Sequence, residues 1–251
     1  MNENTPQKSL IYGIRPLIEA IEAGKEIEKI FIKKDATSQQ HSELLRLIRD
    51  NKLTYQYVPV EKLNRITMKN HQGVVAFISP ITYDNIEQIV PTLYEDGITP
   101  LVLVLDGVTD VRNFGAICRT AECAGVNAIV YAEKGSAIIN EDAVKASAGA
   151  ILNIPICKVK NLVGTVKFLA QCGLNIVACT EKTNDTYYNI NYTEPTAIIL
   201  GSEGEGISFD LIRLSVFEAA IPLKGKTESL NVSCAAAVIL YEVVRQRSIN
   251  Q

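Results

Sequence analysis

The stretch IPLKGKTESLNVSCAAAVILYEVVRQR, from Ile221 to Arg247, decides how the second half of the chain is read. It follows an apolar strand expected over 217–221 and crosses a polar loop into a helix. Ser229-Leu-Asn is typical of a helix start, because a side-chain oxygen there accepts from the free N–H groups of the first turn. Beyond it, apolar and small residues recur at helical spacing, so one face should be buried. They are Val232, Ala235, Ala236, Ile239 and Val243.

Upstream of this stretch, short apolar runs alternate with amphipathic segments. Buried strands are expected over 101–105, 128–131, 156–159, 176–179, 197–200 and 217–221. Helices are expected between most of them, over 113–124, 141–148, 162–172 and 209–214. This alternation predicts a doubly wound α/β domain, with a parallel sheet and helices on both faces.

The first part of the chain has a smaller α/β pattern. Residues 1–9 are expected to be disordered. Helices are expected over 16–23, 38–51 and 60–66, and strands over 27–33, 54–59 and 73–78. Proline and glycine between 81 and 99 predict a linker with one short helix, 85–94. We therefore expect a small α/β domain over 1–80, a linker over 81–99 and a larger α/β domain over 100–251.

The composition is that of an ordinary globular protein, with 47% hydrophobic and 21% charged residues. No apolar run approaches the ~20 residues that span a membrane. Met1 to Lys8 lacks the apolar core of a signal peptide, so a cytoplasmic location is expected. The six cysteines include no C-x-x-C pair and are expected to be buried free thiols rather than metal ligands or disulfides.

The charge balance gives no support to non-specific nucleic-acid binding. There are 12 basic and 13 acidic residues before Thr99, and 13 and 15 from there on, out of 25 and 28 in all. Non-specific binders usually carry a basic excess, because their affinity is built on phosphate contacts. A local basic face remains compatible with these totals.

The loop Leu200-Gly-Ser-Glu-Gly-Glu-Gly206 follows the end of an expected strand, where open α/β sheets bind ligands. It contains neither G-x-G-x-x-G nor G-K-[ST], and Glu203 and Glu205 would repel phosphate. The loop therefore suits an uncharged nucleoside and a sulfonium group better than a nucleotide phosphate. The structural alternative is a tight turn without a ligand.

A third stretch, DGVTDVRNFGAICRTA, opens the helix after the first strand of the larger domain. Asn113 and Arg119 are six residues apart in it, about 240° around a helix axis, so they do not share one face. They have separate tasks, or Arg119 serves a neighbouring subunit. An arginine in so apolar a helix is suited to grip a phosphate or carboxylate.

In this order and spacing the three stretches resemble the motifs of the SpoU/TrmH family of RNA ribose 2′-O-methyltransferases. The resemblance implies a homodimer with a trefoil-knotted, SPOUT-type C-terminal domain that uses S-adenosylmethionine. Ile11-Tyr-Gly-Ile and His71-Gln-Gly-Val-Val-Ala resemble the small, ribosomal-protein-like RNA-binding domain of the branch that acts on 23S rRNA. A guanosine of 23S rRNA is the implied substrate. A tRNA ribose, or a non-catalytic role in RNA binding or ribosome assembly, is the alternative.

The resemblance also assigns residues. The residues implied for catalysis are Asn113, Arg119, Glu203, Ser229 and Asn231. The residues implied for cofactor binding are Leu200, Gly201, Glu203, Gly206, Ile221, Leu223 and Leu230, and no metal is expected. The family assigns the arginine as general base, but a guanidinium is essentially never deprotonated in proteins, so aligning an RNA phosphate is the better role for Arg119. Val111 stands where many members carry proline, and this departure removes no functional group.

Overall fold

The structure is a computed structural model that describes residues 10–34 and 38–249. These residues form two compact units. The first comprises the residues up to Thr82 together with Ile138–Glu141, and the second comprises Tyr83–Ala137 together with the residues from Asp142 onward. The expected disorder of residues 1–9 concerns a segment outside the described residues. The expected linker carries α4 (Ile86–Glu95), whose Ile86 and Val90 are buried in the core of the second unit.

The first unit has one four-stranded sheet in the order β1-β4-β2-β3, in which only β2 and β3 are parallel. Its elements, in chain order, are β1 (Leu10–Tyr12), α1 (Ile14–Glu22), β2 (Ile27–Lys33), α2 (Gln39–Asp50), β3 (Tyr55–Val58), α3 (Val60–Ile66) and β4 (Val74–Ile78). β1 was not expected, and it is extended because it pairs with β4, Leu10 opposite Phe77.

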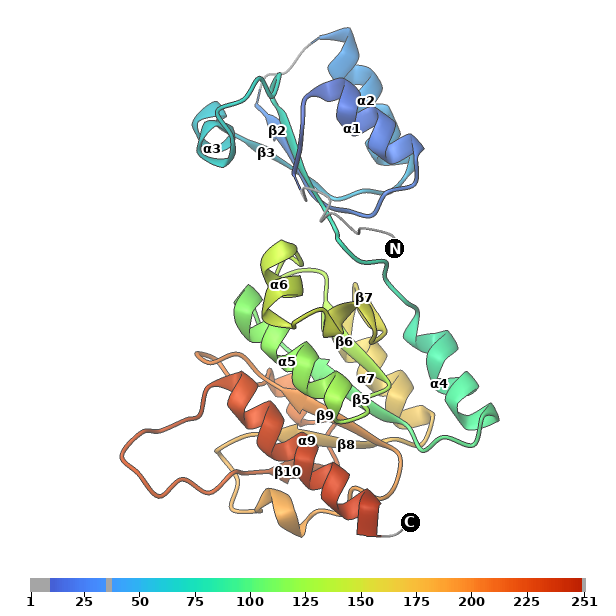
Figure 1. Ribbon diagram of the computed structural model, residues 1–251, viewed down its shortest axis with the longest axis vertical. Coiled ribbons are helices and arrows are strands. Elements are labelled where there is room, and N and C mark those ends of the chain that lie inside the picture. Colours follow the sequence, from blue (N-terminus) through green and yellow to red (C-terminus); the bar gives the residue numbers. More distant parts are fainter. Residues whose placement is uncertain (1–9, 35–37, 250–251) are drawn as a thin grey trace. The chain divides into compact units, whose positions relative to one another are not determined.

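Alternation along β2 gives this sheet two cores. Ile30 and Ile32 pack under α1 and α2, while Phe31 between them points to the other face and packs with Leu63 of α3. Figure 1 shows α1 and α2 together on one side of the sheet and α3 on the other. The small α/β unit expected from the sequence is therefore present in the described residues.

The second unit has a six-stranded parallel sheet in the order β10-β8-β9-β5-β6-β7. The strands are β5 (Leu101–Leu105), β6 (Ala128–Ala132), β7 (Ile156–Val159), β8 (Asn175–Cys179), β9 (Thr196–Leu200) and β10 (Phe217–Ala219). β5 and β9 are entirely buried, as the continuous apolar runs predict for central strands. The predicted parallel α/β fold is confirmed.

Helices cover both faces of this sheet. α4, α7 (Leu162–Gln171) and α8 (Phe209–Ile212) pack on one face, over Val102 and Val104. On the other face α5 (Val111–Cys123) lies beside α9 (Val232–Ile249), and Phe114 of α5 meets the ring of Tyr131 edge-on, with ring centroids 5.1 Å apart. Figure 1 shows α5 and α9 side by side. α6 (Glu141–Ala146) and the 3₁₀ turns η1 (Ala150–Leu152) and η2 (Tyr187–Asn189) complete the unit.

Two expected boundaries near the chain's end can be compared with the structure. β10 ends at Ala219 rather than at residue 221, because the N–H of Ala220 donates to the Asp185 carbonyl instead of continuing the pairing with β8. The helix start was predicted correctly. Asn231 Oδ1 accepts from the backbone N–H of Ser233 at 2.9 Å, and α9 begins at Val232.

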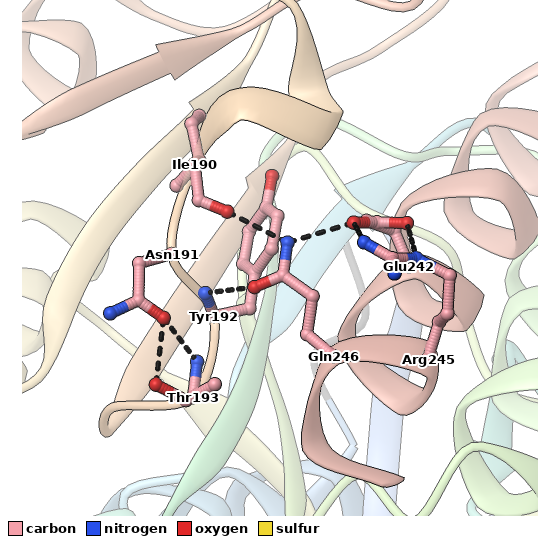
Figure 2. A network of polar contacts seen from close by, with 7 residues as sticks. All are labelled: Ile190, Asn191, Tyr192, Thr193, Glu242, Arg245 and Gln246. Atoms are coloured by element: carbon pink, nitrogen blue, oxygen red, sulfur yellow. Dashed lines mark hydrogen bonds and ion pairs between the residues drawn. The ribbon is translucent and has the colours of Figure 1, made fainter. Parts of the chain in front are cut away.

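Side chains of α9 hold the connection between η2 and β9 (Figure 2). Gln246 accepts from the Tyr192 N–H at 2.8 Å and donates to the Ile190 carbonyl at 2.8 Å. It also donates to Glu242 at 2.7 Å, while Arg245 pairs with both oxygens of Glu242, at 2.7 and 2.8 Å. A carboxylate buried to 8% exposure is thereby fully partnered, as buried charge requires.

The six cysteines are all free, but the expectation that they are buried is wrong for two of them. Cys123 and Cys234 are exposed, because they fall on the outward faces of α5 and α9. Within the described residues no helix is both long and apolar enough to cross a membrane. No group of three histidine, cysteine or acidic side chains is placed there to hold a metal ion.

Candidate functional site

The site begins where the two central strands end. Leu105 of β5 lies opposite Leu200 of β9, and the N–H of Asp106 donates to the Leu200 carbonyl at 2.9 Å. Asp106 then accepts from the N–H of Ser208 at 2.7 Å through its carboxylate. The loops after β5 and β9 therefore leave the same edge of the sheet side by side, the edge at which open α/β sheets bind ligands.

The loop after β9 folds back on itself. Ser202 and Gly206 exchange two backbone hydrogen bonds, at 3.2 and 3.0 Å. A Cβ added to Gly201 would lie 2.2 Å from the carbonyl carbon of Gly206 and 2.4 Å from the nitrogen of Ile207. Only glycine allows this approach of backbone to backbone, which fixes the shape of the glycine loop, residues 201–206.

One side chain from each of the three sequence stretches meets in a polar cluster. Glu203 Oε1 accepts from the amide of Asn113 at 3.0 Å and from the amide of Asn231 at 2.6 Å. The Asn231 amide also lies 3.1 Å from Asn113 Oδ1. Asn113 is held in the first turn of α5, where its N–H donates to the capping Asp110 carboxylate at 2.8 Å. We call Asn113, Glu203 and Asn231 the amide–carboxylate cluster.

A hollow of about 230 Å³ opens on one side of the glycine loop. All seven residues expected to bind the cofactor line it, together with Ser229. Four that the sequence did not single out also line it, namely Cys179, Thr180, Glu181 and Lys182, which end and follow β8. We call this space the glycine-loop hollow.

The lining of the glycine-loop hollow suits a nucleoside with a cationic substituent. Leu200, Ile221 and Leu230 provide apolar contact, and the loop supplies backbone groups rather than a phosphate cradle. Its wall carries three carboxylates, those of Glu181, Glu203 and Glu205, against one lysine, Lys182. Negative charge in this excess disfavours a phosphate and favours a sulfonium.

Cys179 contributes no nucleophile to the glycine-loop hollow. The residue is partly exposed, but burial of its thiol raises the pKa to about 12. The thiolate is the reactive form, so this thiol is protonated and inert near neutral pH. The side chain serves as an apolar part of the wall.

A second hollow, of about 400 Å³, lies on the side of the glycine loop towards α5. It is lined by Gly107–Asp110, Asn113 and Gly135, and it shares Ser202–Glu205 and Val232 with the glycine-loop hollow. Glu203 therefore belongs to the walls of both spaces. The arrangement can hold one molecule in each hollow with the amide–carboxylate cluster between them.

Arg119 is the one predicted catalytic residue that lies outside this assembly. It is exposed on α5, and no hydrogen bond or ion pair joins it to any described residue. The predicted separation of Arg119 from the face of Asn113 agrees with this placement, since neither hollow includes Arg119. Ser229 lines the glycine-loop hollow but not the amide–carboxylate cluster.

Comparison with known proteins identifies the larger unit. Residues 100–241 match the model of the SpoU rRNA methylase family, more than half of the 251-residue chain. The chain belongs to the SpoU rRNA methylase family. Residues 10–84 match the model of an RNA 2′-O ribose methyltransferase substrate-binding domain. The protein is thus an RNA 2′-O-methyltransferase with an N-terminal substrate-binding domain, and the trefoil knot is implied by its family.

Relatives of this SpoU methylase cover nearly all of its length. A Staphylococcus saprophyticus protein named for the TrmH family of tRNA/rRNA methyltransferases is 35% identical over 242 residues, covering 96% of this chain and 97% of that protein. The crystal structure of an RNA 2′-O ribose methyltransferase is 26% identical, with a TM-score of 0.59 over 95% of this chain and 88% of the other. An AdoMet-bound rRNA methyltransferase from Sinorhizobium meliloti is 25% identical, with a TM-score of 0.60 over 94% and 86%.

Proposed function

We propose that this chain methylates the ribose 2′-oxygen of a guanosine in 23S rRNA, as a cytoplasmic homodimer. The observation that carries the proposal is the amide–carboxylate cluster between two hollows, built from all three sequence stretches. A tRNA ribose is the second candidate, because the relatives are named for both RNA classes.

S-adenosylmethionine is the methyl donor, and when bound it supplies an electrophilic methyl group on a sulfonium. The residues that would hold it line the glycine-loop hollow: Leu200, Gly201, Glu203, Gly206, Ile221, Leu223 and Leu230. The apolar side chains and the excess of carboxylates fit such a molecule. Thr180, Glu181 and Lys182 extend this set from the end of β8.

The amide–carboxylate cluster orients the acceptor ribose in the second hollow. Asn113 has one further amide N–H and Glu203 one further carboxylate oxygen, so both hydroxyl groups of a ribose could be engaged, while the Asn231 amide holds these two side chains in place. Holding the acceptor oxygen within about 3–3.5 Å of the methyl group, and aligned, supplies much of the acceleration in such reactions. Ser229 contributes a hydroxyl at the other side of the glycine loop.

Arg119 grips a phosphate of the RNA in the site of the neighbouring subunit. Its exposure and its lack of a partner among the described residues support this role, as does its position off the face of α5 that carries Asn113. A guanidinium fork binds phosphate oxygens in two parallel hydrogen bonds. Fixed in this way, a phosphate oxygen accepts a hydrogen bond from the 2′-hydroxyl, which eases the loss of the hydroxyl proton to the surrounding water.

The two units divide the work. Residues 1–80 bind the RNA, 81–99 connect the units, and 100–251 carry the methyl transfer. The separate matches over 10–84 and 100–241 support this division.

Mapping of ribose methylation tests the substrate. In 23S rRNA and tRNA from cells lacking the protein, one guanosine of 23S rRNA should lose its 2′-O-methyl group, and the purified chain should restore it. Loss of a tRNA methyl group instead would favour the second candidate. Unchanged methylation in both RNAs, together with no transfer by the purified chain, would refute the proposal.

A further inference from the structure

The small unit contains a hollow of about 510 Å³ that the methyl transfer does not use. It lies between the end of β2, the start of α2, the start of α3 and the turn before β4. Its lining residues are Lys33, Ser38, His41, Val60 and Lys69–Gly73. We call it the histidine hollow.

The turn that forms one wall is held tightly against β2. Gln72 and Gly73 both have positive φ, at 50° and 79°, and the Gly73 carbonyl accepts from the Lys33 N–H at 2.8 Å. A Cβ on Gly73 would lie 3.2 Å from the Cβ of Lys33 and 3.4 Å from Nε2 of His41. The Gln72 side chain accepts from the N–H of Ile14 at 3.3 Å and so ties the same turn to α1. The wall is therefore part of the folded unit.

Two hydrogen bonds hold the ring of His71 in place. Its Nδ1 accepts from the Gly73 N–H at 3.0 Å, so that nitrogen carries no proton. Its Nε2 lies 2.9 Å from Asn64 Oδ1 and is the donor of that pair. The ring is thus positioned by its two neighbours and presents its flat side chain to the hollow.

One ring nitrogen of His41 has no hydrogen-bond partner among the described residues. Nδ1 lies 2.7 Å from the Ser38 hydroxyl, while Nε2 is buried without a hydrogen-bond partner among the described residues. Buried polar atoms are nearly always partnered, and an orphan requires an explanation. Because this nitrogen is covered in the structure, a ligand group in the histidine hollow reaches it only when the wall of the hollow shifts.

The charge of the lining indicates what such a ligand is. Lys33 and Lys69 line the hollow, and none of its described lining residues carries a carboxylate, although the chain as a whole has a net charge of −3. Lys69 lies over the ring of Tyr12, 5.4 Å from its centroid, which holds the ammonium at the rim. Lysine binds phosphate as a point charge, and the Asn70 amide adds uncharged hydrogen-bonding groups.

We infer that the histidine hollow binds a phosphate-bearing nucleotide of the RNA substrate. This rests on the proposed function and adds to it a second contact with the RNA, made within the small unit. A phosphate binds between Lys33 and Lys69, and the attached nucleoside lies against the two histidine rings.

The chain supplies its own reporter for this site, because His41 and His71 are its only histidines. Full-length protein labelled with ¹³C at the histidine rings, purified with a tag that contains no histidine, has only these two residues to report. A short mixed-sequence single-stranded RNA should shift both ring signals. Inorganic phosphate at matched ionic strength should shift them less, and S-adenosylmethionine should shift neither.

The salt dependence of binding gives a second, independent measurement. Lys33→Gln combined with Lys69→Gln removes two phosphate contacts, so the slope of log affinity against log salt should fall by about 1.4 on single-stranded RNA. At about 0.1 M salt this corresponds to roughly 25-fold weaker binding. Lys52→Gln removes one lysine charge just past the far end of α2, where Lys52 is exposed, and should leave the slope unchanged.

The outcomes separate this inference from the proposed function. The inference is overturned if RNA binds without shifting the histidine ring signals, or if the double variant has the same salt slope as the natural chain. Either result leaves the proposed function standing. Signals that respond to inorganic phosphate but not to RNA also overturn it, because the site would then serve a free anion. A chain that binds no RNA at all would instead contradict the proposed function.

Discussion

Replacing Gly201 by alanine should open the glycine loop. The added Cβ would lie 2.2 Å from the carbonyl carbon of Gly206, 2.4 Å from its oxygen and 2.4 Å from the nitrogen of Ile207. Real Cβ contacts essentially never fall below 3.0 Å, and all three atoms belong to the backbone. No side chain can move aside to relieve the clash, so residues 202–206 must shift.

The cost follows from what holds the loop closed. Ser202 and Gly206 exchange two backbone hydrogen bonds, and each contributes about 0.5–1.5 kcal/mol, so opening costs about 1–3 kcal/mol. If S-adenosylmethionine binds only the closed loop, the loop of the variant must close again before binding. The cost of closing it reduces the free energy of binding by the same amount, which raises Kd by about 5- to 150-fold. If the same cost falls on the folded state, Tm decreases by roughly 2–12 °C in a chain of this size.

Calorimetric titration with S-adenosylmethionine checks the expected change in Kd, and a thermal melt checks the expected change in Tm. Gly225→Ala is the matched control, because it makes the same chemical change at a residue that lines neither hollow, and its Cβ would meet nothing within 4 Å. The control should bind within a factor of about two of the natural chain, since its cost is only a few tenths of a kcal/mol. Equal affinity of the Gly201→Ala variant and the natural chain would refute the role given to this backbone contact.

Three other changes have expected outcomes. Arg119→Ala should leave Tm and cofactor affinity unchanged while the rate of methyl transfer to RNA falls at least 100-fold. Arg119→Lys should restore little activity, because a point charge cannot replace the bidentate guanidinium fork. Loss of folding in the alanine variant would show a structural role instead. The hydrogen bonds from Arg245 hold the pKa of Glu242 below its usual value, so this carboxylate stabilises the fold above the usual carboxyl pKa and the contribution is lost as pH falls through the lowered value. Denaturant melts of Glu242→Gln should therefore show lower stability near neutral pH and a smaller loss on acidification than the natural chain, and equal pH slopes would contradict this. Arg247 donates to the carbonyls of four residues, Thr99, Pro100, Tyr192 and Glu194, and Arg247→Ala should reduce the free energy of unfolding by roughly 3 kcal/mol, whereas a loss below about 1 kcal/mol would show that water replaces these bonds.

The sequence predicted well the strands whose two faces are both buried. The run Leu101–Leu105 has the expected bounds, because a central strand needs apolar residues at every position. Ile156–Val159 also has the expected bounds, although β7 lies at the edge of the sheet and contains Lys158. Prediction failed where a partner strand decides the structure. Leu10–Tyr12 became a strand only because β4 lies beside it, and the apolar run after Ala219 stopped being one because Ala220 bonds to Asp185.

The site was predictable from local chemistry only in part. The glycines at 201 and 206 and the cap at Asn231 are local signals, and the structure places all three at the glycine-loop hollow or the cluster beside it. Residues 179–182 carry no comparable signal. They line the glycine-loop hollow because β8 is the neighbour of β9 in the sheet, a fact that periodicity along the chain cannot contain.

The strand order explains why stretches so far apart in sequence meet at one place. β6 and β7 extend the sheet on one side of β5, whereas β8 and β10 lie beyond β9 on its other side. The order reverses between β5 and β9, and a crevice therefore opens at their carboxyl ends. The loop after β10 crosses back to this crevice, where Asn231 has two tasks: its Oδ1 caps α9, and its amide reaches Glu203. Since one side chain both begins the last helix and closes the amide–carboxylate cluster, the helix start and the cluster depend on the same residue.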